Sequence, residues 1–151
     1  MRRHRQFEGS FDGVTAAASW LREAAADAAL GAQPTFALEV CLEELLVNVV
    51  THGGPGRSAN GAATPLTIGL ELAFDAETVE MSIEDNGRSF DVSQAPGKPI
   101  KRPLEEIVPG GLGMQLIRSF SSELLYEALP YGNRVIVKLL RHSQPGAKAG
   151  A

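Results

Sequence analysis

The sequence predicts an α+β fold, a two-layer sandwich in which a mostly antiparallel sheet carries its helices on one face. Two helical segments rich in alanine and leucine come early, whereas short segments of alternating apolar and polar residues follow residue 65. The 151 residues, 44% of them hydrophobic, are enough to bury one substantial core. We therefore expect a single domain over residues 1–141 and a disordered tail over residues 142–151.

The first segments are expected to form a strand and a helix. Residues 3–11 predict a short opening strand, and the alanine-rich residues 14–30 predict a helix that Gly31 ends. Trp20 shares the helical spacing of the apolar residues, which indicates a packing anchor. Thr35 is a candidate cap for the helix that follows.

The second helix, residues 36–53, combines a core face with a line of polar residues. Glu44, Asn48 and His52 are spaced four apart and therefore share one side, with Glu43 beside them. A Glu-x-x-x-Asn pattern alone fits a satisfied polar pair as well as a site. The opposite side is expected to form the core through Leu38, Leu42, Leu45, Leu46 and Val49.

The rest of the chain is read mainly as strands and loops. The long segment over residues 91–109, rich in proline, is typical of a lid, a binding loop or a partly disordered stretch. The expected elements are a flexible loop (53–64), two antiparallel strands (65–74 and 79–85), a helix after Gly113, and two final strands (123–128 and 134–140).

Charge and targeting patterns favour a protein of the cytoplasm. The formal net charge of −4 argues against nucleic acid or an anionic membrane as the main partner. The N-terminus lacks the apolar run of a signal peptide, and no stretch reaches the roughly 18 apolar residues of a membrane span. The single cysteine, Cys41, excludes an internal disulfide and is expected to be a small buried hydrophobe.

Three motifs gain meaning from their order. Asp85-Asn86-Gly87 alone suits a tight turn, and the glycines at 110–113 alone suit any helix start. After a helix with Glu44 and Asn48, they match a metal ligand, a base-reading carboxylate and an anion-binding helix terminus. Together they indicate a nucleotide site.

These motifs resemble those of a known superfamily. E-L-L-V-N-V-V-T-H-G over residues 44–53 resembles the N box of the GHKL ATPases, whose fold is the Bergerat fold. D-N-G-R-S-F over residues 85–90 resembles the G1 box, and G-L-G-M-Q-L-I over residues 111–117 resembles the G2 box. In its small size and in the His-Gly pair after the N box, the chain is similar to the anti-sigma-factor serine/threonine kinases.

The resemblance implies a role for each matching residue. Asn48 would ligate the Mg²⁺ that bridges the phosphates of ATP, and Glu44 would be the catalytic residue that orients or deprotonates the incoming hydroxyl. Asp85 would accept a hydrogen bond from the adenine amino group, and Gly87 would allow close backbone approach to the base. The phosphates would be wrapped by Gly111 and Gly113.

Some assignments stay open. Lys98, Lys101 or Arg102 would neutralise the γ-phosphate or belong to a solvated loop. His52 is expected to be structural, and the spacing to Asn48 selects Glu44 over its neighbour Glu43. Family members often carry threonine after a glycine on the late strand, where this chain has Asn133, which would supply a polar contact to the adenine pocket.

The resemblance implies an ATP- and Mg²⁺-dependent protein kinase that acts as an anti-sigma regulatory factor. It would phosphorylate a STAS-domain antagonist, would bind a sigma factor, and would form a homodimer. There are two alternatives. One is a non-catalytic protein-interaction module whose shape depends on bound nucleotide, and the other is a detached ATP-binding domain of a histidine kinase. His4, His52 and His142 are poorly placed as phospho-acceptors for the latter.

Overall fold

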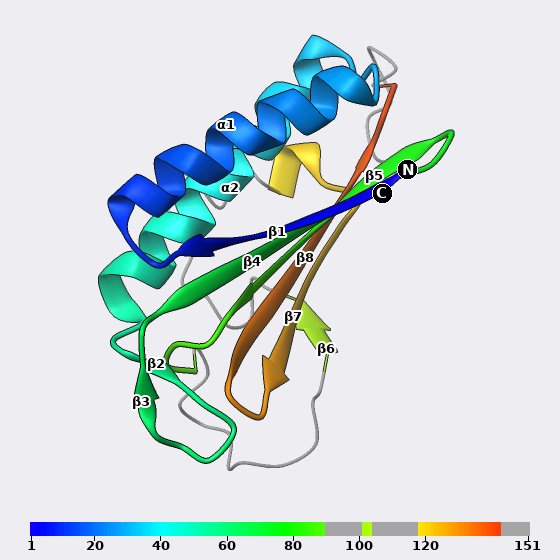
Figure 1. The fold of residues 1–151 in the computed structure, drawn as a ribbon. Coiled ribbons are helices and arrows are strands. Elements are labelled where there is room, and N and C mark those ends of the chain that lie inside the picture. Colours follow the sequence, from blue (N-terminus) through cyan, green and yellow to red (C-terminus); the bar gives the residue numbers. More distant parts are fainter. Residues whose placement is uncertain (90–100, 104–117, 143–151) are drawn as a thin grey trace.

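The computed structural model describes residues 1–89, 101–103 and 118–142 (Figure 1). Its helices are α1 (Phe11–Asp27) and α2 (Ala32–His52), and residues 118–120 are also helical. Its strands are β1 (Arg2–Glu8), β2 (Gly56–Arg57), β3 (Ala63–Thr64), β4 (Thr67–Phe74), β5 (Thr78–Asp85), β6 (Lys101–Pro103), β7 (Glu123–Leu129) and β8 (Gly132–Leu140).

The main sheet has six antiparallel strands in the order β1-β4-β5-β8-β7-β6. Both α1 and α2 pack on the same face of this sheet (Figure 1), which confirms the predicted two-layer α+β architecture. β5 lies between β4 and β8, so its last residue, Asp85, is flanked by strands on both sides. None of the helices in the described part of the chain is long and apolar enough to cross a membrane.

Helix α1 begins three residues earlier than the sequence predicted. Ser10 caps it, because its Oγ accepts a hydrogen bond of 3.1 Å from Gly13 N. Trp20 is the expected packing anchor, since it is 8% exposed and meets Phe7 edge to face at 5.9 Å.

Helix α2 also begins early, and the prediction that Thr35 caps it is wrong. Its N-cap is Gly31, which makes no side-chain capping bond, and Thr35 instead donates from Oγ1 to Gly31 O at 2.8 Å inside the first turn. Cys41 is fully buried, and burial raises the pKa of its thiol to about 12. The predicted core face is confirmed for Leu38, Leu42, Leu45, Leu46 and Val49.

Two short strand pairings were not predicted. The segment read as a flexible loop contains the β2–β3 hairpin, and β6 pairs with β7 inside the segment read as a lid. The strand predictions for β1, β4, β5, β7 and β8 are confirmed within a few residues. The remainder of the lid, the helix start at residues 110–117 and most of the predicted tail, residues 143–151, lie outside the described residues.

Candidate functional site

Asp85 is a buried carboxylate at the end of the central strand β5. It is 6% exposed, and its Oδ1 accepts hydrogen bonds from Gly87 N at 2.9 Å and Asn133 Nδ2 at 3.0 Å. Burial raises the pKa of Asp85 to about 6, although both hydrogen bonds act in the opposite direction. Among the residues that the structure describes, no donor is within hydrogen-bonding distance of Oδ2. Within the described part of the chain, protein donors thus engage only Oδ1 of this buried carboxylate.

Asn133 supports Asp85 from the neighbouring strand β8. It is 0% exposed, its Nδ2 also donates to Arg88 O at 2.8 Å, and its Oδ1 accepts from the Tyr126 hydroxyl at 2.7 Å. The amide is therefore engaged by the protein itself at both ends. Sequence reasoning named Asn133 but missed Tyr126, whose inward position in the alternating pattern of β7 was the available signal.

Two glycines allow the backbone to approach closely around Asp85. Gly132 has a φ of 147°, and a Cβ there would lie 1.8 Å from Asp85 O. A Cβ on Gly87 would lie 2.9 Å from Gly53 O and 3.0 Å from Leu66 Cδ1. Gly87 is therefore required where β5 meets the end of α2, and its approach to a base remains a prediction.

The end of α2 is tied to the turn after Asp85. Arg88 N donates to Gly53 O at 2.7 Å, directly after the last residue of the helix. Asn48 precedes Gly53 by five residues, which is about 7.5 Å along the axis. Asn48 is half-buried and Glu44 is exposed on the same side of α2. The structure therefore ties the C-terminal end of α2 to the turn after Asp85, and among the described residues no hydrogen bond joins Asn48 or Glu44 to Asp85.

The Asp85-Asn86-Gly87 segment is also a structural joint. Asn86 Oδ1 accepts from Thr67 N at 2.8 Å, and Asn86 Nδ2 donates to Pro65 O at 3.1 Å. Arg57 N donates to Asn86 O at 2.8 Å, which fastens the β2–β3 hairpin to the same turn. The structural interpretation of this motif is therefore confirmed, while the base-reading role of Asp85 stays a prediction.

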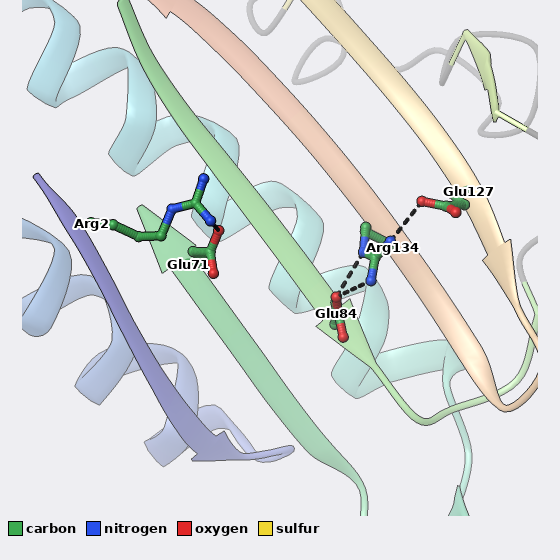
Figure 2. Close-up of polar contacts among 5 residues, drawn as sticks. All are labelled: Arg2, Glu71, Glu84, Glu127 and Arg134. Carbon is green, nitrogen blue, oxygen red and sulfur yellow. Dashed lines mark hydrogen bonds and ion pairs between the residues drawn. The ribbon is translucent and has the colours of Figure 1, made fainter. Parts of the chain in front are cut away.

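The face of the sheet opposite α1 and α2 carries charged side chains (Figure 1 and Figure 2). Arg134 on β8 pairs with Glu84 on β5 and with Glu127 on β7, and its closest contact to Glu84 is 2.5 Å. Glu84 precedes Asp85 on the same strand, so the two carboxylates point to opposite faces. Only Asp85 belongs to the layer that α2 covers.

The side chains of several predicted site residues are not described by the structure. Gly111, Gly113 and Lys98 lie outside the described residues. The backbones of Lys101 and Arg102 pair with Glu127 and Tyr126 in β6.

The described part of the chain has no preformed set of side-chain ligands for a divalent cation. No group of three or more His, Cys, Asp or Glu side chains is positioned there to hold one. Mg²⁺ commonly keeps waters and takes most other ligands from substrate phosphates, so a single amide oxygen such as that of Asn48 fits it. The residues present are thus compatible with a metal that arrives with a nucleotide.

Comparisons with known proteins agree with the observed fold. A family model described as a histidine kinase-like ATPase domain matches residues 7–139. The chain is 34% identical over 133 residues to serine/threonine-protein kinase BtrW of Bordetella bronchiseptica, with 87% of each chain covered. Its fold resembles a crystal structure of the RsbU and RsbW domains of a Mycobacterium tuberculosis protein, with a TM-score of 0.60 and 16% identity. That match covers 95% of this chain and only 34% of the other, and it bears on the fold alone.

Proposed function

The chain belongs to the histidine kinase-like ATPase domain family, and on this premise we propose that it is an ATP- and Mg²⁺-dependent serine/threonine protein kinase. The family match confirms that the chain resembles the GHKL-type ATPases. The observation that carries the proposal is the buried Asp85, whose Oδ2 has no donor among the described residues. The name of BtrW, a serine/threonine-protein kinase, supports the reaction class.

Adenine recognition is assigned to Asp85. A buried carboxylate with one open oxygen is suited to accept a hydrogen bond from an amino group, and charge makes that bond stronger than a neutral one. Asn133 and Gly87 hold the other oxygen, so the carboxylate presents a defined orientation. Adenine carries such an amino group at the edge that ATP would present.

Phosphate and metal binding are assigned to Asn48, Gly111 and Gly113. Asn48 would hold Mg²⁺ through its side-chain oxygen, while the two glycines would let the backbone surround the phosphates. The bound Mg²⁺ would neutralise charge on the phosphates during transfer. The half-buried position of Asn48 near the end of α2 supports this role.

Glu44 is the proposed catalytic base. It lies one helical turn before Asn48 on the same side of α2, and it is exposed, so a protein substrate can reach it. Its carboxylate would accept the proton of the attacking serine or threonine hydroxyl. The neighbouring Glu43 is also exposed but lies off this line, which makes it a matched control.

The proposed protein substrate is a STAS-domain antagonist, and the proposed second partner is a sigma factor that the homodimer binds. The name of the relative BtrW supports the kinase part of this assignment, while the STAS-domain substrate and the sigma factor rest on the resemblance of the sequence motifs. A histidine-kinase role would need a phospho-accepting histidine in cis or in trans; within the described part of this chain, His4 lies on strand β1 and His52 is the last residue of α2.

A transfer assay tests the proposal. Purified protein is incubated with γ-labelled ATP, Mg²⁺ and candidate STAS-domain proteins from the same genome, and acid-stable label on serine or threonine is measured. We expect transfer by the wild type and by Glu43→Gln, loss of transfer in Glu44→Gln with ATP binding retained, and loss of Mg²⁺-dependent binding in Asn48→Ala.

The negative outcomes differ in meaning. ATP binding without transfer to any partner would favour the non-catalytic module. Unchanged transfer by Glu44→Gln would remove the base assignment. No ATP binding by the wild type would refute the site as a whole.

A further inference from the structure

Three side chains on neighbouring strands form a hydrogen-bonded row that ends at Asp85. Tyr126 on β7 donates to Asn133 Oδ1 on β8 at 2.7 Å, and Asn133 Nδ2 donates to Asp85 Oδ1 on β5 at 3.0 Å. Tyr126, Asn133 and Asp85 are 1%, 0% and 6% exposed, so water competes little for these bonds. The three hydrogen-bonded side chains therefore belong to the buried core.

The partners of Asn133 decide which end of its amide faces Asp85. A carboxamide can present either its NH₂ group or its oxygen to a neighbour. Here Arg88 O accepts from Nδ2 at 2.8 Å, while the Tyr126 hydroxyl donates to the oxygen at the other end. Turning the amide over would set its oxygen against both the Arg88 carbonyl and the carboxylate. Asn133 is thus held as a donor toward Asp85.

We propose that Asn133 and Tyr126 are positioning residues that keep Asp85 an ionised hydrogen-bond acceptor and thereby select a 6-aminopurine over a 6-oxopurine. This proposal rests on the proposed nucleotide-binding function. A carboxylate accepts from the amino group of adenine, whereas a protonated carboxyl donates and suits the 6-oxo group of hypoxanthine or guanine. A donor held against the carboxylate favours its charged form.

The pKa of Asp85 lies close enough to neutral pH for the loss of one hydrogen bond to change its protonation state. Burial raises the pKa of Asp85 to about 6, and the bonds from Asn133 and Gly87 N oppose this rise. Of the two donors, only Asn133 can be removed by a side-chain substitution. No charged side chain of the described residues contributes to this pKa. The charged or titratable side chains on the segments that adjoin Asp85 are Glu43, Glu44, His52, Arg57, Glu84, Arg88 and Arg134.

The test compares the dissociation constants of ATP and ITP between about pH 5.5 and about pH 8.5. We expect ATP affinity to fall as the pH is lowered and Asp85 becomes protonated. In Asn133→Leu the pH at the midpoint of this fall should rise by about one unit, because the carboxylate has lost a hydrogen-bond donor. The ATP preference over ITP should narrow by about tenfold near neutral pH, and ATP affinity should recover at the alkaline end. Tyr126→Phe should shift the midpoint in the same direction by a smaller amount.

The second tyrosine of the chain provides a matched control. Tyr131 is 44% exposed in the turn between β7 and β8, so Tyr131→Phe should reproduce the wild-type profile. Tyr126→Phe keeps the buried ring and carries the test alone if Asn133→Leu does not fold.

Two results overturn the proposal in different ways. Folded variants that bind ATP more weakly at every pH, with the midpoint and the ATP-to-ITP ratio unchanged, would show a purely structural role for Asn133 and Tyr126. A wild-type protein that binds no ATP at any pH would instead refute the underlying nucleotide function.

Discussion

Asn133 Nδ2 donates a hydrogen bond of 3.0 Å to Asp85 Oδ1 at the position where β8 and β5 pair these two residues directly. Both side chains lie in the core, where an unpaired carboxylate would be costly. The register of two strands therefore provides the donor that makes the buried carboxylate tolerable. The contact engages Oδ1, and Oδ2 has no donor among the described residues.

Asp85→Asn is expected to weaken ATP binding by about tenfold or more. The substitution replaces a charged acceptor by a neutral one, which lowers the strength of a hydrogen bond to a ligand amino group by about 1.4 kcal/mol. Titration of a fluorescent ATP analogue measures the dissociation constant. Glu84→Gln is the matched control, because Glu84 lies on the same strand but faces the opposite side and should leave binding unchanged.

The free energy of unfolding should depend on the protonation of Asp85. Its pKa is raised from 3.8 to about 6 by burial, so the folded state binds the proton more tightly than the unfolded state. This stabilisation is fully present below about pH 4 and is lost as pH rises through about 6, for a total of about 3 kcal/mol.

Urea unfolding of wild type and Asp85→Asn at several pH values isolates this effect. The wild type should lose stability relative to the variant between about pH 4 and about pH 7. A constant difference over that range would show that Asp85 has an ordinary pKa in the folded protein.

Gly132→Ala is expected to destabilise the protein by about 3 kcal/mol and to weaken ATP binding. The φ of 147° is strained for alanine, and the new Cβ would lie 1.8 Å from the Asp85 carbonyl oxygen, so the backbone must shift. Urea unfolding at neutral pH measures the change. Gly69→Ala serves as the comparison, because its nearest new contact is an ordinary 3.6 Å and its stability should change by less than about 0.5 kcal/mol. Equal effects at both glycines would contradict the close approach at Gly132.

Cys41 should be unreactive toward a thiol reagent in the folded protein. It is fully buried, and burial raises its pKa to about 12, so the thiolate is scarce near pH 8. Because it is the single cysteine, its labelling rate under native conditions should report the opening of α2 and should rise sharply in urea. Rapid labelling of the folded protein would mean that the packing of α2 against the sheet is looser than described.

The sequence determined the features that depend on local periodicity. A helix brings residues four apart to one side whatever surrounds it, so the division of α2 into a core face and a line with Glu44 and Asn48 was predictable. Alternation likewise predicted β4 and β5. Helix starts were less predictable, because Gly31 begins α2 without any side-chain capping bond, and the side-chain cap of Ser10 on α1 was not recognised in the sequence.

Only the tertiary structure decided how Asp85 is supported. Asn133 lies 48 residues from Asp85 in the chain, and their contact depends on the pairing register of β5 and β8. Tyr126 joins the row because β7 pairs with β8 on its other side. Strand register is a non-local property, set by which apolar faces the whole sheet buries under its helices. The sequence could therefore name the carboxylate, while the donor that orients it emerged from the assembled sheet.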